Sequence, residues 1–116
     1  MTHAAPAPSP VELDKLVVFV PTEHTEALID ALAAAGAGAL GNYERCAWTT
    51  PGTGTFRPVA GADPAIGEVG AISHVPETRV EMVVPRHLRS AVVAALRAAH
   101  PYEEPAFDVI ETVRVP

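Results

Sequence analysis

The sequence predicts an α+β domain with ferredoxin-like topology: a split βαβ repeat that forms a four-stranded antiparallel sheet with two helices on one face. Three observations support this prediction. The 116 residues suit one domain, the apolar residues follow strand and helix periods, and a strand-proline-helix pattern occurs twice. Placing the first pattern on the second pairs Leu16 with Val80, Pro21 with Pro85, Leu28 with Val92 and Leu32 with Leu96.

The first half of the chain begins with an apolar run at residues 15–20, which ends at a proline and is typical of a buried strand. The amphipathic residues 22–35 predict a helix that two glycines terminate. A second strand is expected over residues 39–48, and we expect Tyr43 and Trp48 to pack in the core or in an interface.

Residues 49–76 form a long excursion between the two halves. They are rich in glycine and proline and have no helical period, which predicts a long hairpin or an Ω-like loop with short strands near 53–57 and 66–72. A connection of this length is usually functional or takes part in assembly.

The second half predicts a strand over residues 78–84, a helix over 86–99 and a last strand over 107–113. Both helices of this topology cover the same face of the sheet. The first strand is apolar on both faces, so its other face needs a cover. We therefore expect several subunits to associate through their sheets.

Composition limits the classes of function. The net charge of −6 and the pI of about 5.2 argue against nucleic acid and against an anionic membrane surface as partners. A single cysteine excludes an intrachain disulfide. We expect residues 1–13 to be a disordered arm, residues 14–116 to be the folded domain, and the protein to be cytoplasmic, with no membrane-spanning segment.

The connection at residues 100–105, His-Pro-Tyr-Glu-Glu-Pro, allows two interpretations. His100, Glu103 and Glu104 are nitrogen and oxygen donors that could hold a divalent metal, zinc or copper. Alternatively, the stretch is structural: Pro101 and Pro105 restrict the backbone, Tyr102 packs under the sheet, and the other side chains make capping or interface contacts.

The excursion offers a second candidate site. The hydroxyls of Thr53 and Thr55, with free backbone amides and Arg57 as counter-charge, could bind an anionic small ligand. No Walker-type motif is present, and glycines that only permit a tight hairpin explain the composition equally well. No nucleophile-base pair is found, so we name no catalytic residue.

Several stretches together resemble the insert domain of YqfO-type proteins of the Nif-three-like family: residues 15–21, 38–43, 50–58, 66–70 and 100–105. Residues 100–105 also resemble the corresponding connection in CutA. The resemblance implies a CutA/PII-like fold and a homotrimer. In that family the two-metal site lies on a separate domain outside this insert, so a hydrolase activity is not expected for an insert that stands alone.

The expected function is that of a non-enzymatic oligomer that binds a divalent metal ion or a small ligand at inter-subunit clefts, with a regulatory or metal-tolerance role. Two alternatives stay open. The domain is a structural or protein-interaction module without a ligand, or it is an enzyme whose site is built from several subunits.

Overall fold

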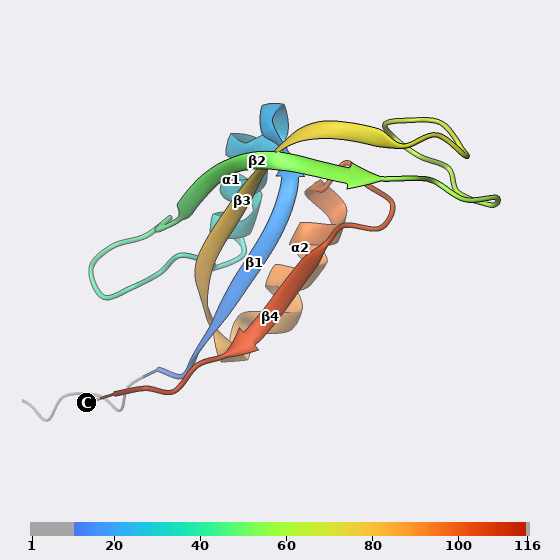
Figure 1. The fold of residues 1–116 in the computed structure, drawn as a ribbon. Helices are drawn as coiled ribbons and strands as arrows, with labels where there is room; N and C mark the ends of the chain where they lie inside the picture. The colour runs from blue at the N-terminus through green and yellow to red at the C-terminus, as the bar shows by residue number, and fades with distance from the viewer. Residues whose placement is uncertain (1–10, 116) are drawn as a thin grey trace, which may run out of the picture.

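The computed structural model describes residues 11–115, which form a four-stranded antiparallel sheet with two helices on one side (Figure 1). The elements in chain order are β1 (Leu13–Pro21), η1 (Thr22–His24), α1 (Thr25–Ala34), β2 (Trp48–Phe56), β3 (Ser73–Pro85), η2 (Arg86–Leu88), α2 (Arg89–Ala99) and β4 (Phe107–Glu111). The strand order β2-β3-β1-β4 is that of a split βαβ repeat, so the predicted fold class is confirmed. Most of the predicted N-terminal arm lies outside the described residues.

The two halves of the chain turn from strand to helix in the same way. β1 ends at Pro21 and β3 ends at Pro85, with φ angles of −51° and −54°. Proline lacks an amide hydrogen and has a φ close to the helical value, so it both ends a strand ladder and starts a helical turn. Each proline is followed by one 3-10 turn and then by an α-helix.

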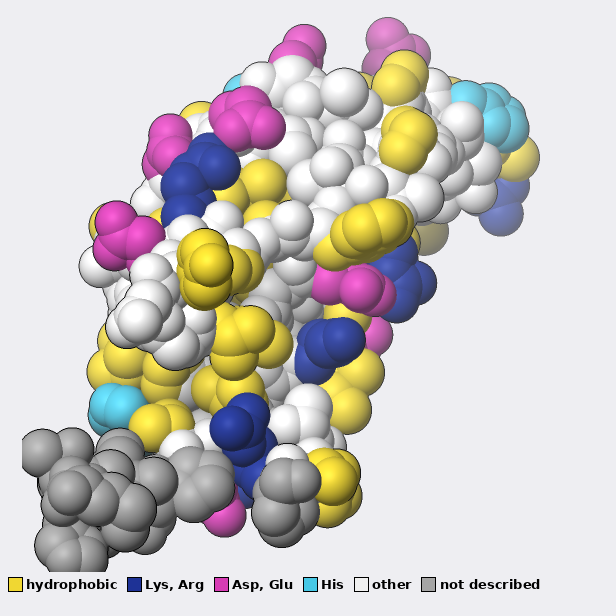
Figure 2. Space-filling model, turned by 90° about the vertical axis from the view of Figure 1, so that its left-hand side faces the viewer, with side chains coloured by type: hydrophobic (Ala, Val, Ile, Leu, Met, Phe, Trp, Pro, Cys, Tyr) yellow, Lys and Arg dark blue, Asp and Glu magenta, His cyan; other side chains and the backbone are white. Residues whose placement is uncertain are grey.

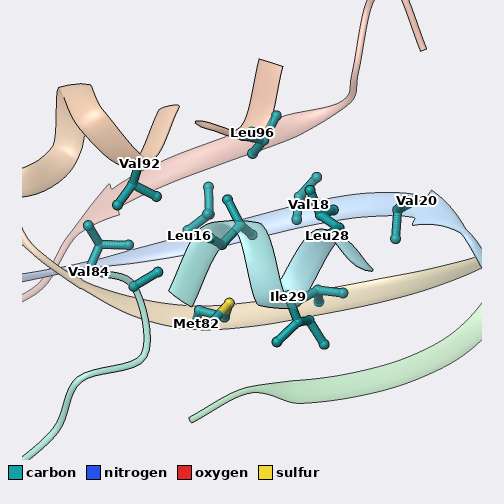
Figure 3. Packing of buried hydrophobic residues seen from close by; sticks show 12 residues of the cluster. Leu16, Val18, Val20, Leu28, Ile29, Met82, Val84, Val92 and Leu96 are labelled. Carbon is teal, nitrogen blue, oxygen red and sulfur yellow. The ribbon is translucent and has the colours of Figure 1, made fainter. Parts of the chain in front are cut away.

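One apolar core lies between the sheet and the two helices (Figure 3). Alternate residues of the central strands and the inner faces of the helices supply its buried side chains: Leu16, Val18, Val20, Leu28, Ile29, Leu32, Ala37, Val80, Met82, Val84, Val92 and Leu96. Burial of one Val, Leu, Ile or Met side chain contributes about 1.5–3 kcal/mol, so this cluster is the main source of stability.

The strand predicted over residues 39–48 is wrong, because β2 begins only at Trp48. The preceding residues form a loop with one isolated bridge between Leu40 and Tyr43. The side chains of Tyr43 and Trp48 are 75% and 68% exposed in the single chain, so neither packs in the core. Their place in an interface stays a prediction.

Backbone geometry explains why residues 39–47 do not extend the strand. Gly38 has a φ of +82°, and a Cβ there would meet the backbone of Cys46. Arg45 has a φ of +57°, which is incompatible with a regular strand. Its guanidinium forms ion pairs of 2.8 Å with Glu26 and with Asp30, both in α1. The loop therefore packs beside α1 instead of continuing the sheet.

The excursion is a long hairpin, which is one of the two alternatives predicted from the sequence. β2 pairs with β3 along its whole length, from Trp48 opposite Glu81 to Phe56 opposite Ser73. The hairpin extends away from the helices in Figure 1. The short strand predicted at residues 66–72 is wrong, because that segment consists of bends and turns that join the two strands.

A buried ion cluster joins β1 to the start of α2. Asp14 has no solvent exposure, and its carboxylate accepts hydrogen bonds from Arg89 at 2.6 Å and from Arg86 at 2.8 Å. The hydrogen bond from Arg89 is the main reason why the pKa of Asp14 lies below its usual value. A buried carboxylate is tolerated here because two guanidinium groups compensate for its lost hydration.

The face of the sheet without helices carries both apolar and charged side chains. Residues directly opposite each other on antiparallel strands point to the same side, so Val17 shares this face with Glu81 and Trp48. Ile110 lies opposite Lys15 on the same face, and Trp48 and Ile110 are both exposed. Figure 2, seen from the side of residues 39–47, shows hydrophobic groups between basic and acidic ones.

Candidate functional site

A pocket of about 300 Å³ lies between the β2–β3 hairpin and the connector that joins α2 to β4. Four parts of the chain line it: the end of β1, the end of β2 with the following loop, one residue of β3, and the connector. The lining residues are Phe19, Gly54, Thr55, Phe56, Arg57, Pro58, Ala62, Pro64, Ala65, Ile66, Glu77, Tyr102, Glu103, Glu104 and Ala106. The two stretches that the sequence singles out separately therefore face one pocket.

His100 anchors the connector to the sheet. Its side chain is buried, at 6% exposure, and its Nε2 lies 2.7 Å from the carbonyl oxygen of Phe19. The backbone N–H of Tyr102 donates to Nδ1 at 3.1 Å, so Nδ1 is the acceptor and Nε2 carries the hydrogen. Burial lowers the pKa of His100, which favours this neutral form. Both ring nitrogens are thus used within the fold.

Tyr102 and Glu77 form the polar base of the pocket. The hydroxyl of Tyr102 donates to Oε2 of Glu77 at 2.8 Å, and only 9% of Glu77 is exposed. Burial, followed by the hydrogen bond to Glu77, raises the pKa of Tyr102, so the phenol stays protonated and acts as a donor. The ring of Phe56 contacts Tyr102 edge to face, with 5.7 Å between the ring centroids.

Gly54 makes room for the Glu77 carboxylate. A Cβ added to Gly54 would overlap Oε1 of Glu77, so the space of a side chain on β2 is taken by a carboxylate from β3. Glu77 is not among the site residues predicted from the sequence, because it precedes the strand predicted over residues 78–84. The local signal for it is Gly54, since a glycine inside a strand indicates that another group approaches closely.

Glu103 connects the connector to the loop of the hairpin. Its Oε1 accepts a hydrogen bond of 3.0 Å from the backbone N–H of Asp63. Glu104 also lines the pocket. This hydrogen bond joins residues 40 positions apart and holds the hairpin loop beside the pocket. Glu103 therefore makes a structural contact and also lines the pocket.

The residues predicted to bind an anion are only partly brought together. Thr55 and Arg57 line the pocket, whereas Thr53 does not. Thr53 and Thr55 belong to β2 and lie opposite Pro76 and His74 of β3. The backbone there is a strand paired with its neighbour, so the expected cradle of free amides is not formed at these positions.

The metal hypothesis gains no support from this geometry. His100 is engaged on both ring nitrogens and does not line the pocket that Glu103 and Glu104 line. Over residues 11–115, no group of three or more His, Cys, Asp or Glu side chains is arranged to hold an ion. Tyr102 helps to anchor the connector through its backbone N–H and its hydroxyl. The structural roles expected for Pro101 and Pro105 stay predictions.

The architecture defines the domain as a CutA/PII-like member of the ferredoxin-fold class. The solved structure of the periplasmic divalent cation tolerance protein CutA from Archaeoglobus fulgidus superposes with a TM-score of 0.64 and 17% identity, over 90% of this chain and 87% of that chain. CutA1 from Oryza sativa gives a TM-score of 0.63 and 16% identity, over 91% and 84%. Identities this low establish the fold alone.

Sequence similarity shows that the chain is homologous to one part of the NIF3-related proteins, their CutA-like insert domain. The GTP cyclohydrolase 1 type 2 homolog of Mycobacterium tuberculosis is 51% identical over 111 residues, which are 96% of this chain and 29% of that protein. The homolog from Bacillus subtilis is 45% identical over 104 residues, 90% of this chain and 28% of that protein.

A solved structure gives the same assignment. The Bacillus cereus protein related to NIF3 has a TM-score of 0.77 and 42% identity, over 93% of this chain and 28% of that chain. No protein-family model matches the chain. The chain thus spans less than a third of the length of these relatives, and the resemblance predicted from the sequence is confirmed.

Among the described residues, no helix is long and apolar enough to cross a membrane.

Proposed function

We propose that this domain is a non-enzymatic, self-associating module that binds a small organic ligand in the pocket between the β2–β3 hairpin and the connector. The proposal rests on the presence, in one pocket of about 300 Å³, of aromatic rings and of the buried Glu77 carboxylate bonded to the half-buried Tyr102. Small-molecule sites have this character: a mostly apolar lining and a few placed polar groups. The activity in the relatives' name is not extended to this chain, which matches under a third of their length.

The pocket walls are held in place by contacts within the chain. His100 fixes the connector to β1, and Glu103 fixes the hairpin loop to the connector. A site whose walls are already positioned loses less conformational entropy when a ligand binds. We therefore expect binding without a large rearrangement of the domain.

The CutA-like fold suggests oligomerisation. Two surfaces support the homotrimer expected from the sequence. The helix-free face of the sheet exposes Trp48 and Ile110, and the hairpin loop exposes Val59, Val69 and Ile72. Exposed apolar groups of this kind mark contact surfaces. In such an assembly the hairpin loop of one subunit would reach a neighbour and place the pocket near a subunit boundary.

Light scattering coupled to size exclusion tests the assembly. We expect a mass of three chains for the unmodified protein and of one chain for Trp48→Glu, because a carboxylate would be buried without a partner in the sheet contact. Val113→Glu is the control, since Val113 is an exposed apolar residue that follows β4 and belongs to neither of the two surfaces. A monomeric unmodified protein at high concentration would contradict the proposal.

A fragment screen followed by amide NMR tests the pocket. Fragments that bind are expected to shift the amide signals of Phe56, Glu77 and Tyr102 in a saturable manner. Titration with Zn²⁺ and Cu²⁺ forms a separate arm, with Glu103→Gln and Glu104→Gln as variants. Metal binding that these variants abolish would establish the ion as the ligand, whereas fragment and metal titrations that both leave the pocket unchanged would refute a binding function.

A further inference from the structure

The chemistry of the pocket indicates which kind of ligand it takes, if the proposed binding function holds. The pocket is lined by three carboxylates, those of Glu77, Glu103 and Glu104. It is lined by one cation, the guanidinium of Arg57. With all four ionised, the lining carries two negative charges more than positive ones. A phosphate or carboxylate ligand would meet this negative field at close range, which is unfavourable in a partly enclosed site.

Glu77 is the strongest single determinant. It is more than nine-tenths buried, and Tyr102 is the side-chain donor that the described residues provide for it. A carboxylate has about four acceptor positions. No other side chain of the described residues donates to it, so a cationic donor placed in the pocket has acceptor positions of Glu77 to bind.

Three aromatic rings line the same pocket as this carboxylate. They belong to Phe19, Phe56 and Tyr102, and the guanidinium of Arg79 lies over the ring of Phe19 at 5.8 Å from its centroid. Aromatic faces attract cations through the ring quadrupole. Arg79 is paired with Glu81 at 2.8 Å and does not line the pocket, so its charge is balanced outside it, and its position shows that a guanidinium fits against the Phe19 ring.

We propose that the pocket selects an organic cation, an amine or amidinium that pairs with the Glu77 carboxylate and carries a flat apolar body that packs against Phe19 and Phe56. The charge of Glu77 discriminates against neutral and anionic ligands, and the rings of Phe19 and Phe56 provide the contact area. The proposal depends on the cavity, the aromatic lining and the buried carboxylate together.

Three probes of one shape test this inference on the full chain: benzamidine, its neutral analogue benzamide, and benzoate. Amide NMR titration is expected to show saturable shifts at Gly54, Phe56 and Tyr102 with benzamidine. Benzamide should bind at least about tenfold more weakly, since a hydrogen bond to a charged partner contributes about 1.5–3 kcal/mol. Benzoate should bind more weakly still.

Glu77→Gln keeps the shape of the side chain and an acceptor for Tyr102, and it should remove the preference for benzamidine over benzamide. Glu68→Gln, an exposed position in the hairpin loop, is the control and should keep that preference. Selectivity on the unmodified protein does not depend on the stability of any variant.

The outcomes separate the two proposals. Equal or stronger binding of benzamide or benzoate at the pocket would overturn the choice of a cation and would leave the binding function in place. A preference for benzamidine that survives Glu77→Gln would also overturn the assignment to Glu77. No saturable binding by any of the three probes would overturn the cation inference, and the fragment screen then decides on the binding function itself.

Discussion

The hydroxyl of Tyr102 donates a hydrogen bond of 2.8 Å to the carboxylate of Glu77. This bond joins the connector after α2 to β3, and both residues line the pocket beside the hairpin. The carboxylate lies where β2 has only a glycine, Gly54. The connector, β3 and the space beside Gly54 thus together form the polar base of the pocket.

Replacing Tyr102 by Phe should destabilise the fold by about 1–3 kcal/mol, because it leaves the buried Glu77 carboxylate without its side-chain donor. Urea unfolding followed by circular dichroism measures the effect. Tyr43→Phe is the matched control, since the side chain of Tyr43 is 75% exposed and its loss of a hydroxyl should leave the midpoint unchanged. Equal midpoints for both variants would mean that the Tyr102–Glu77 bond contributes nothing to stability.

Replacing Gly54 by Ala should also destabilise the fold, by about 1–3 kcal/mol, because the new methyl group would push the buried Glu77 carboxylate away from its hydrogen bond with Tyr102. Gly52→Ala tests the same change on the same strand, where no atom lies within 4 Å of the added Cβ. It should be neutral or slightly stabilising, since alanine restricts the unfolded chain. Denaturant midpoints that fall equally in both variants would point to a backbone effect instead.

Stability should decrease as the pH falls below about 6.5, because burial lowers the pKa of His100 in the folded state below its ordinary value of 6.5. In that range the unfolded chain binds a proton at residue 100 and the folded chain does not, so protons favour unfolding. Thermal unfolding between pH 7.5 and pH 5.5, a range of about two units around the reference pKa, measures this dependence.

His100→Gln should flatten this pH dependence, whereas His87→Gln should preserve it, since His87 is exposed. If both variants keep the pH dependence of the unmodified protein, a group other than His100 is responsible.

A second pH effect is expected in acid. Hydrogen bonds from Arg89 and Arg86 lower the pKa of Asp14 below 3.8. A carboxylate with a depressed pKa stabilises the fold above its unfolded pKa, and this stability is lost as the pH falls through the folded pKa. The carboxyl carbon of Asp14 should therefore titrate below pH 3.8 by NMR.

Asp14→Asn should reduce the acid sensitivity of the urea midpoint, and Asp108→Asn, at an exposed position of β4, should not. An Asp14 carboxyl that titrates at or above 3.8 would show that the two guanidinium groups do not stabilise its charge.

The sequence predicted the elements whose signals are local. β1, both helices and β4 follow from apolar periods and from the prolines at 21 and 85, which act on their immediate neighbours in the chain. The strand predicted over residues 39–48 was wrong because its structure depends on a contact distant in sequence. Residues 39–47 look like a strand by alternation, but Arg45 pairs with Glu26 and Asp30 of α1, and no local pattern records that contact.

The candidate site divides in the same way. The sequence by itself determined that residues 100–105 and the excursion hold unusual side chains, since composition is visible in the chain. Only the tertiary structure decided that His100 bonds the carbonyl of Phe19, 81 positions away, and that Glu77 replaces a side chain at Gly54. Long-range packing decides which polar groups are already satisfied, and therefore which are left for a ligand.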